Sequence, residues 1–460
     1  MNNRKKIHVL LHLSAGSVLV LVSILTGYIK GFSLYWRPVQ SAILVAGLVI
    51  ILIGFMTQTG AVARTSANLC LFILSISIIL SLCEGFFRLV GFDFAREEEA
   101  WRETPPYYRL PIVPTGEVFF RRPGPEKWTG HVLNTRLQQL HVLPNPYGDE
   151  PLIRVQYDKL GFRNEDDLSD WEVAVAGDSF TELGYLPYDQ LFTTILGKTM
   201  NVRVLNLGTS YTGPLTQLSY VQDYGVSPST KHAIIVFFEG NDLDDLGREY
   251  AALARFRETG EREYREFKKQ TSMLRALFRL RYTLMPQKTA DAWVNAYFKS
   301  AHGDIPISLD YTPPGKAQIP AERMHQLEYF LHRYAAFTQG RGIKAWLAYM
   351  PCKLRVVHGQ IEFSEGAPEE LRKWGPTDLP QVISALSDRY GVEFIDLTPA
   401  LVEETESSRE LVFNSIYETH LNSRGSLVVA KEMARHLSAQ DSLSPNNRAA
   451  ADAVNRAAER

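Results

Sequence analysis

The sequence predicts an α/β domain built on a parallel sheet with helices on both faces, preceded by an apolar N-terminal region. Two observations predict this architecture. Three long apolar segments lie within residues 1–92. After them come five short apolar runs separated by helix-compatible sequence: EVAVAG, VRVLNLG, HAIIVFFEG, IKAWLAYMP and VEFIDL. At 460 residues the chain also exceeds the length that one hydrophobic core usually supports, which indicates more than one structural unit.

The N-terminal apolar segments cover residues 10–29, 39–56 and 67–82, each close to the ~20 residues that a helix needs to cross a bilayer. We therefore expect a three-helix membrane anchor over 1–92. A cleaved signal peptide is the alternative for the first segment, but two more apolar runs follow it and no clear cleavage site is present.

Basic residues near the segment ends favour an N-terminus on the inner side, because Lys and Arg concentrate in cytoplasmic loops. The two sides compared are Arg4, Lys5, Lys6 and Arg64 against Lys30 and Arg37. Three crossings then carry the remaining chain to the outer face. The expected location is the inner or plasma membrane, multi-pass, with an extracytoplasmic domain.

Composition narrows the class of function. A formal net charge of -2 offers no overall basic field, so we expect no nucleic-acid partner. Three cysteines are too few for a disulfide framework. A cysteine can act as a nucleophile, but the sequence around Cys352, MPCKLRVV, supplies neither a turn to present the thiol nor a base to activate it.

The remaining chain divides into further segments. Residues 93–164 are rich in Pro, Tyr and Arg, with strand-like runs such as GEVFFRR and LIRVQYDKLGFR, and predict a stalk and a small β-rich cap. Residues 165–440 form the predicted α/β domain, with an insertion over 242–320. Its basic segment SMLRALFRLRYTLM suits either an anionic lipid surface or packing on its own domain. Residues 441–460 are polar and rich in Ala, Asn and Arg, and this composition predicts a disordered tail.

Ser179 is the first candidate for chemistry. Gly177, Asp178 and Ser179 directly follow the apolar run WEVAVA, which places the serine on the turn that leaves a buried strand. Glycine lets the backbone bend there, and N–H groups at a helix start can face a developing oxyanion. Alone, the triplet also fits a helix N-cap.

Two later strand ends add polar groups at the same sheet edge, where open α/β sheets bind ligands. The run VRVLNLGTSYTG contains Asn206, and IIVFFEGND ends near Asn241. The Asn241 amide, the N–H of Ser179 and a backbone N–H from residues 206–213 could form an oxyanion hole. As isolated features, both asparagines also fit turns.

A serine hydroxyl needs a base, and His420 is the best candidate among the histidines. It lies in the polar loop IYETHLNSRG after the last strand-like run. Glu418, two residues earlier, is close enough along the chain to orient the imidazole.

The blocks GDSF, NLG…G, GND and ETHLN, in this order over about residues 173–436, resemble the SGNH (GDSL-like) hydrolase superfamily, in a membrane-anchored bacterial form. The resemblance implies a flavodoxin-like three-layer α/β/α sandwich and an acyl-enzyme mechanism on esters without metal or cofactor. It assigns Ser179 as nucleophile, Asn241 as oxyanion donor and His420 as base. YDKLGFRN also resembles the lead-in of membrane-associated members.

Two positions depart from the family pattern. Many members have aspartate three residues before the histidine, where this chain has Tyr417, so the acid role passes to Glu418 or is absent. Tyr211 stands where the family often has the oxyanion glycine, which leaves the N–H groups of Tyr211 and Gly213 as alternatives.

The sequence therefore predicts a membrane-anchored serine esterase that hydrolyses acyl esters, with acetyl groups on an envelope glycan as the expected substrate. An O-acetyltransferase acting on an exported polysaccharide is the first alternative. Alginate-type acetyltransferases place their acid–histidine pair before the serine, and the order in this chain favours a hydrolase. The second alternative is a catalytically silent glycan-binding or scaffold protein, supported by Tyr417.

Overall fold

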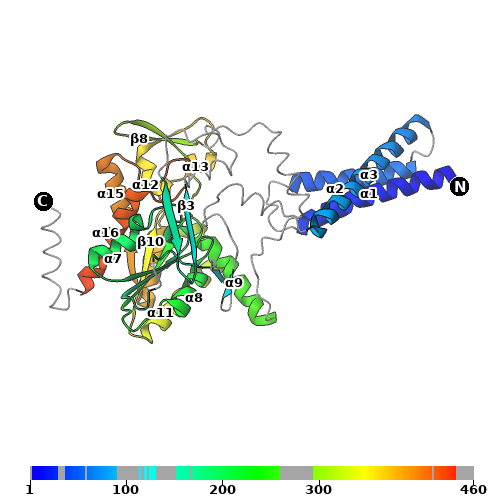
Figure 1. Cartoon of the computed structure of the whole chain (residues 1–460). Coiled ribbons are helices and arrows are strands. Elements are labelled where there is room, and N and C mark those ends of the chain that lie inside the picture. The colour runs from blue at the N-terminus through cyan, green and yellow to red at the C-terminus, as the bar shows by residue number, and fades with distance from the viewer. Residues whose placement is uncertain are drawn as a thin grey trace. The chain divides into compact units, whose positions relative to one another are not determined.

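The structure is a computed structural model. It describes residues 3–28, 37–56, 60–90, 113–115, 119–121, 124–130, 152–165, 168–259, 294–416 and 419–441. The chain divides into two units, one containing the N-terminal helices and the other containing the sheet domain (Figure 1).

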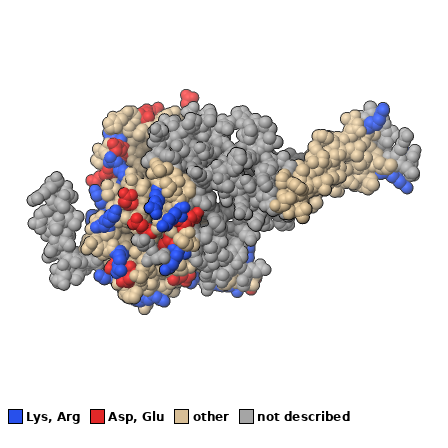
Figure 2. Space-filling view, viewed as in Figure 1, with Lys and Arg blue, Asp and Glu red and all other residues tan. Residues whose placement is uncertain are grey.

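The N-terminal unit contains three helices: α1 (Asn3–Tyr28), α2 (Arg37–Met56) and α3 (Gly60–Leu89). Helices α1 and α2 pack closely through glycines, since a Cβ atom added to Gly16 would lie 2.7 Å from the carbonyl oxygen of Gly47. Such small-residue contacts are typical of helices packed in lipid. Charged side chains are sparse along the visible face of these helices (Figure 2).

One helix segment in the described chain, Ala63–Phe87, is long and apolar enough to cross a membrane. Helix α2 contributes only a shorter apolar stretch, Leu44–Gly54. Helices form at all three predicted places, but the structure supports one crossing by length and composition. The three-crossing anchor stays a prediction.

The second unit is built on a five-stranded, fully parallel sheet, in the order β12-β10-β7-β5-β6. Numbered along the chain, this order is 2-1-3-4-5, as in doubly wound folds, with the topological switch point between β5 and β7. The prediction of a parallel sheet is confirmed. Its five runs form β5 (Val173–Gly177), β6 (Val204–Gly208), β7 (His232–Phe238), β10 (Lys344–Met350) and β12 (Glu393–Asp396).

Both faces of the sheet are covered by helices (Figure 1). Alternate residues of a strand point to opposite faces, so Val173 and Val175 join one core cluster while Ala174 and Ala176 join the other. The first face carries α7 (Phe192–Met200), α12 (Lys353–Val357), α15 (Thr398–Ser408) and α16 (Ser423–Asp441). The second carries α8 (Pro214–Tyr224), α9 (Asp242–Thr259), α11 (Ala321–Gln339) and α14 (Leu379–Tyr390).

The predicted β-rich segment does contain strands. They are β1 (Val113–Thr115) with β2 (Phe119–Arg121), and β3 (Glu126–Gly130) with β4 (Ile153–Tyr157), each an antiparallel pair. Trp128, Val155 and Tyr157 are buried in the same core cluster as strand β5. The β3–β4 pair therefore packs into the sheet domain instead of forming a cap of its own.

The predicted insertion begins with α9 and later contributes two strands, β8 (Ala296–Ser300) and β9 (Gly303–Ile307), to a sheet that the sequence did not predict. With β11 (Ile361–Phe363) they make a three-stranded antiparallel sheet in the order β11-β8-β9. The basic segment within 260–293 and residues 442–460 of the predicted tail lie outside the described residues. The short elements are α6 (Ser179–Glu182), α13 (Glu369–Lys373), η3 (Tyr188–Gln190), η5 (Lys316–Gln318) and η6 (His358–Gln360).

Candidate active site

Ser179 and His420 lie in direct contact although they are 241 residues apart in the chain. Ser179 follows β5 and begins the short helix α6, and its Oγ atom lies 2.6 Å from His420 Nε2. The serine is partly exposed, whereas the histidine is 8% exposed. A hydroxyl hydrogen bonded to an unprotonated ring nitrogen is the geometry required of a nucleophile and its general base.

The turn that presents Ser179 depends on close packing at two glycines. A Cβ atom on Gly177 would lie 2.1 Å from Thr181 Oγ1, and one on Gly208 would lie 2.4 Å from the Glu182 nitrogen. Asp178 caps α6, with Oδ1 accepting the Phe180 N–H at 2.8 Å. The φ of Gly177 does not lie in the left-handed region, so backbone conformation does not require a glycine there. The close approach of α6 does require one, because it leaves no room for a Cβ atom.

The loop of His420 is fixed from both sides. Asn414 donates its N–H to the His420 carbonyl at 2.9 Å, and the Tyr185 hydroxyl donates to the Leu421 carbonyl at 2.9 Å. The Phe180 ring lies 4.5 Å from the imidazole, centroid to centroid. Because these contacts restrain the backbone and the ring, the imidazole is held against the serine.

The predicted acid residue cannot be placed. Glu418 and its neighbour Tyr417 lie outside the described residues. The assignment of Glu418 as the group that orients His420 therefore stays a prediction.

The candidate oxyanion donors have different environments. Asn241 Nδ2 donates to Asp245 Oδ2 at 2.8 Å, which identifies the amide nitrogen and leaves a second N–H on the same atom. The Gly213 N–H donates to Glu249 Oε1 at 2.7 Å and is already committed there. The role of the Tyr211 N–H stays a prediction.

The Asn206 side chain has a supporting role. Its Nδ2 donates to the Thr181 carbonyl at 3.2 Å and to Thr193 Oγ1 at 3.1 Å, and its Oδ1 accepts the Gly208 N–H at 2.8 Å. The residue belongs to β6 and is fully buried. It therefore stabilises the turn that carries Ser179.

Glu182 is a residue that the sequence analysis missed. Its Oε2 accepts both the N–H and the hydroxyl of Ser210 at 2.6 Å, and its Oε1 accepts the Tyr157 hydroxyl. The side chain is fully buried. It links the serine turn, the loop after β6 and strand β4. Nothing in the local sequence distinguishes it from an ordinary helix residue.

The lead-in block YDKLGFRN supports the same region. Arg163 donates to the Leu186 carbonyl at 2.8 Å, and Asn164 Nδ2 donates to the Asn206 carbonyl at 3.0 Å. Both residues are buried. The block therefore holds the chain that follows α6 and the end of β6.

A pair of buried carboxyl groups, Asp178 and Asp242, lies near the reacting atoms. Burial raises the pKa of Asp178 to about 6, against opposing hydrogen bonds and the influence of His420. The pKa of Asp242 is also raised, first by burial and then by the charge of Asp178, while its Oδ2 accepts the Phe238 N–H at 2.8 Å. The charge states of the two groups are therefore linked.

Cys352 does not have the environment of a nucleophile. Its side chain is buried, and burial followed by the nearby Glu239 charge raises the pKa of the thiol well above its usual value. The reactive form of cysteine is the thiolate, which this environment disfavours.

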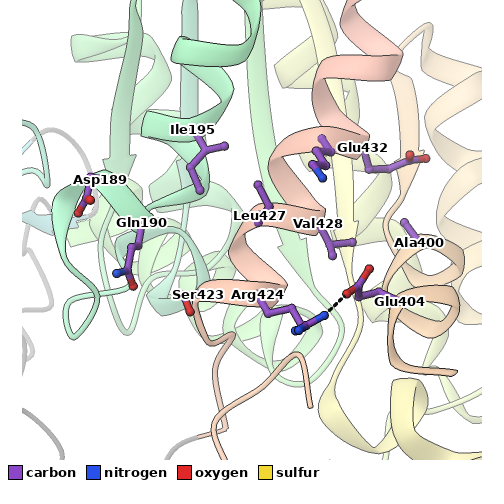
Figure 3. A pocket seen from close by; sticks show the side chains of 11 residues that line it. Asp189, Gln190, Ile195, Ala400, Glu404, Ser423, Arg424, Leu427, Val428 and Glu432 are labelled. Atoms are coloured by element: carbon purple, nitrogen blue, oxygen red, sulfur yellow. Dashed lines mark hydrogen bonds and ion pairs between the residues drawn. The ribbon is translucent and has the colours of Figure 1, made fainter. Parts of the chain in front are cut away.

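A groove of about 690 Å³ lies elsewhere, between η3, α7, α15 and α16 (Figure 3). Its lining includes Asp189, Leu427 and the ion pair between Glu404 and Arg424, and it contains neither Ser179 nor His420. Size alone would favour this groove as a binding site. The chemistry favours the serine–histidine contact, which has the groups that a reaction requires.

No protein-family model matches the chain, and no curated protein matches it. Solved structures similar to it include a lipolytic G-D-S-L family member from Veillonella parvula DSM 2008, with 13% identity, 57% of this chain and 96% of that chain covered, and a TM-score of 0.30. Another is a variant of the acetyl xylan esterase Axe2 from Geobacillus stearothermophilus, with 11% identity, 58% and 94% coverage, and a TM-score of 0.30. At these values the functional conclusion rests on the geometry of the site itself.

Proposed function

We propose that this chain is a membrane-anchored serine esterase of SGNH type that removes acetyl groups from a glycan through an acyl-enzyme. The contact of 2.6 Å between His420 Nε2 and Ser179 Oγ is the main support. The contact lies at the carboxyl end of β5, beside the switch point of the sheet, where doubly wound folds bind ligands.

The reaction has two halves. His420 takes the proton of Ser179 as Oγ attacks the ester carbonyl carbon, and the carbonyl electron pair moves to the oxygen. The oxyanion is stabilised by the second N–H of Asn241 Nδ2 and the backbone N–H groups of Ser179 and Tyr211. The intermediate expels the alcohol, which takes the proton from His420. Water then attacks the acyl-enzyme by the same steps, with Glu418 orienting the imidazole.

Aromatic side chains beside the serine favour a short acyl group. Phe180 stacks on Phe238 with ring centroids 3.9 Å apart, and Tyr311 meets Phe238 edge-on at 5.2 Å. Phe180 and Phe238 are each 1% exposed, so they offer almost no apolar surface on which a long acyl chain could lie. An acetyl group, with its single methyl group, needs the least apolar surface of the common acyl groups.

The membrane part of the proposal rests on the N-terminal unit. Ala63–Phe87 can cross a bilayer by its length and composition, and α1 and α2 pack through glycines in the manner of membrane helices. The basic residues counted from the sequence favour an outward-facing catalytic domain. An enzyme in that position meets envelope glycans.

The test uses the full chain in detergent with p-nitrophenyl acetate and acetylated xylan. We expect Ser179→Ala and His420→Ala each to lower kcat by roughly a thousandfold or more. Asn241→Ala should lower it by about a hundred to a thousandfold. His436→Ala, a histidine that pairs with Glu432 on α16, is the matched control and should keep full activity.

The same assay separates the alternatives. Free acetate as the product supports the esterase, whereas transfer of the acetyl group to an added oligosaccharide supports the transferase. If the wild-type chain turns over no faster than Ser179→Ala, the proposal fails and a silent scaffold is favoured.

A further inference from the structure

Tyr211 has a backbone conformation that no helix end explains. In the described part of the chain, the non-glycine residues with φ in the left-handed region are Tyr211 (φ 67°), Leu183, Asn201 and Arg409. The last three are the C-caps of α6, α7 and α15, where this conformation is common. Tyr211 instead lies in the loop between β6 and α8. A bulky residue there carries a conformational cost, which is a frequent mark of functional positions.

The contacts on either side of Tyr211 hold it in this conformation near the nucleophile. Ser210 is bound through its N–H and hydroxyl to the buried carboxylate of Glu182, at 2.6 Å each. Thr209 donates its N–H to the Gly177 carbonyl at 3.0 Å, and the Thr212 hydroxyl donates to the Thr209 carbonyl at 2.6 Å. Because Glu182 and Gly177 flank Ser179 in the chain, the loop is attached directly to the serine turn.

The Tyr211 side chain is 51% exposed, in contrast to the aromatic residues packed around His420. Phe180 and Tyr185 are buried against the imidazole, with ring centroids 4.5 and 5.8 Å from it. About half of the surface of this side chain is therefore open to a ligand.

An exposed carboxylate lies on the helix turn beside the Tyr211 loop. A Cβ atom on Gly213 would lie 2.7 Å from Asp245 Cβ, so the first turn of α9 adjoins this loop. That turn contains Asp242, Asp244 and Asp245. Asp242 and Asp245 are buried, and Asp245 is paired with Arg248, whereas Asp244 is exposed. Asp244 therefore offers a hydrogen-bond acceptor beside the loop, which suits a neutral ligand with many hydroxyl groups.

We propose that the Tyr211 ring is the platform on which a neutral sugar ring of the substrate stacks, which would make Tyr211 a specificity-determining residue of the esterase. This inference rests on the proposed function. The face of an aromatic ring is negative, and the C–H groups on one face of a pyranose are weakly positive, so the two surfaces attract. The stacked sugar would present its acetyl ester to Ser179.

The test compares two kinds of acetyl ester on the full chain in detergent: p-nitrophenyl acetate, and mono-O-acetylated tetrasaccharides of xylose, glucose or N-acetylglucosamine. Activity on p-nitrophenyl octanoate is measured beside them. The measured quantity is the ratio of kcat/KM for the oligosaccharide to kcat/KM for p-nitrophenyl acetate. We expect Tyr211→Ala to lower this ratio by about tenfold, through a higher KM for the oligosaccharide. Tyr211→Phe keeps the ring and should keep the ratio. Arg409→Gly, also a left-handed position, is the matched control and should leave both activities unchanged.

Several outcomes overturn the inference. An unchanged ratio in Tyr211→Ala means that the ring contacts no sugar. A selective loss of activity on p-nitrophenyl octanoate in the same variant means that the ring contacts an acyl chain. If the wild type hydrolyses p-nitrophenyl acetate but none of the acetylated tetrasaccharides, the sugar platform is wrong while the esterase stands. If the wild type hydrolyses none of these esters, the proposed function itself fails.

Discussion

Replacing Asp178 with asparagine tests the electrostatics next to the nucleophile. The pKa of this carboxyl group rises from 3.8 to about 6 on folding, chiefly through burial. At about 1.4 kcal/mol per pKa unit, keeping the group ionised in the folded protein costs about 3 kcal/mol above pH 6. Because the folded state binds the proton more tightly than the unfolded state, stability falls as pH rises from about 4 to about 6 and stays lower above it.

The Asp178→Asn variant would keep a side-chain oxygen that accepts the Phe180 N–H, while removing the charge. Part of this cost is shared with Asp242, because the Asp178 charge also raises the pKa of Asp242. We therefore expect the substitution to increase the free energy of unfolding by about 1–3 kcal/mol above pH 6. For a domain of this size that gain raises Tm by several degrees, at roughly 2–4 °C per kcal/mol. Thermal unfolding of the full chain in detergent, from pH 4 to pH 8, measures it.

Asp170→Asn is the control with the opposite sign. The hydrogen bond from the Ser229 hydroxyl is the largest of the contacts that lower the pKa of Asp170, and Arg203 also contributes. Its stabilisation is fully present above the unfolded pKa of 3.8 and is lost only as pH falls below that value, so this variant should lower Tm by a similar amount from pH 5 to pH 8. The reasoning on Asp178 is refuted if Asp178→Asn is less stable than the wild type at pH 8, or if the difference is equal at pH 4 and pH 8.

Three further predictions concern the surrounding framework. Glu239→Ala should lower the free energy of unfolding, measured with denaturant, by about 3–5 kcal/mol. The reason is that Arg355 Nε lies 2.7 Å from the Glu239 carboxylate and would stay buried without its charge partner. A loss below about 1 kcal/mol would contradict this. Gly208→Ala should lower both Tm and esterase activity by displacing α6, since the new Cβ would lie 2.4 Å from the Glu182 nitrogen, and wild-type activity would contradict it. Cys352 should react with iodoacetamide only after unfolding, because burial disfavours its thiolate, and mass spectrometry showing rapid native labelling would disprove this.

The central sheet could be predicted because its strands are buried on both faces. Strands in that environment are apolar at nearly every position, as AIIVFF within β7 shows, and they stand out between amphipathic helices. The site could be predicted in part for a related reason. Parallel strands bring their carboxyl ends to one edge, so Ser179 after β5 and Asn241 after β7 were expected to lie near each other.

Contacts that depend on tertiary packing could not be predicted in the same way. The carboxylate of Glu182 meets Ser210 and Tyr157, which come from two other elements, and no local pattern indicates that meeting. The hydrogen bond that the Gly213 N–H donates to Glu249 likewise joins residues that lie 36 positions apart in the sequence. Strands β3 and β4 carry turn-rich neighbours that suggested a separate cap, but their buried side chains complete the core of the sheet domain.

The most direct test of the central claim is the site of covalent labelling by a fluorophosphonate. The full chain in detergent is treated with the probe, digested and mapped by peptide mass spectrometry. If Ser179 is a nucleophile activated by His420, the probe is found on Ser179, and His420→Ala abolishes rapid labelling while His436→Ala does not. A probe on another residue, or equal labelling of Ser179 in His420→Ala, would contradict the claim.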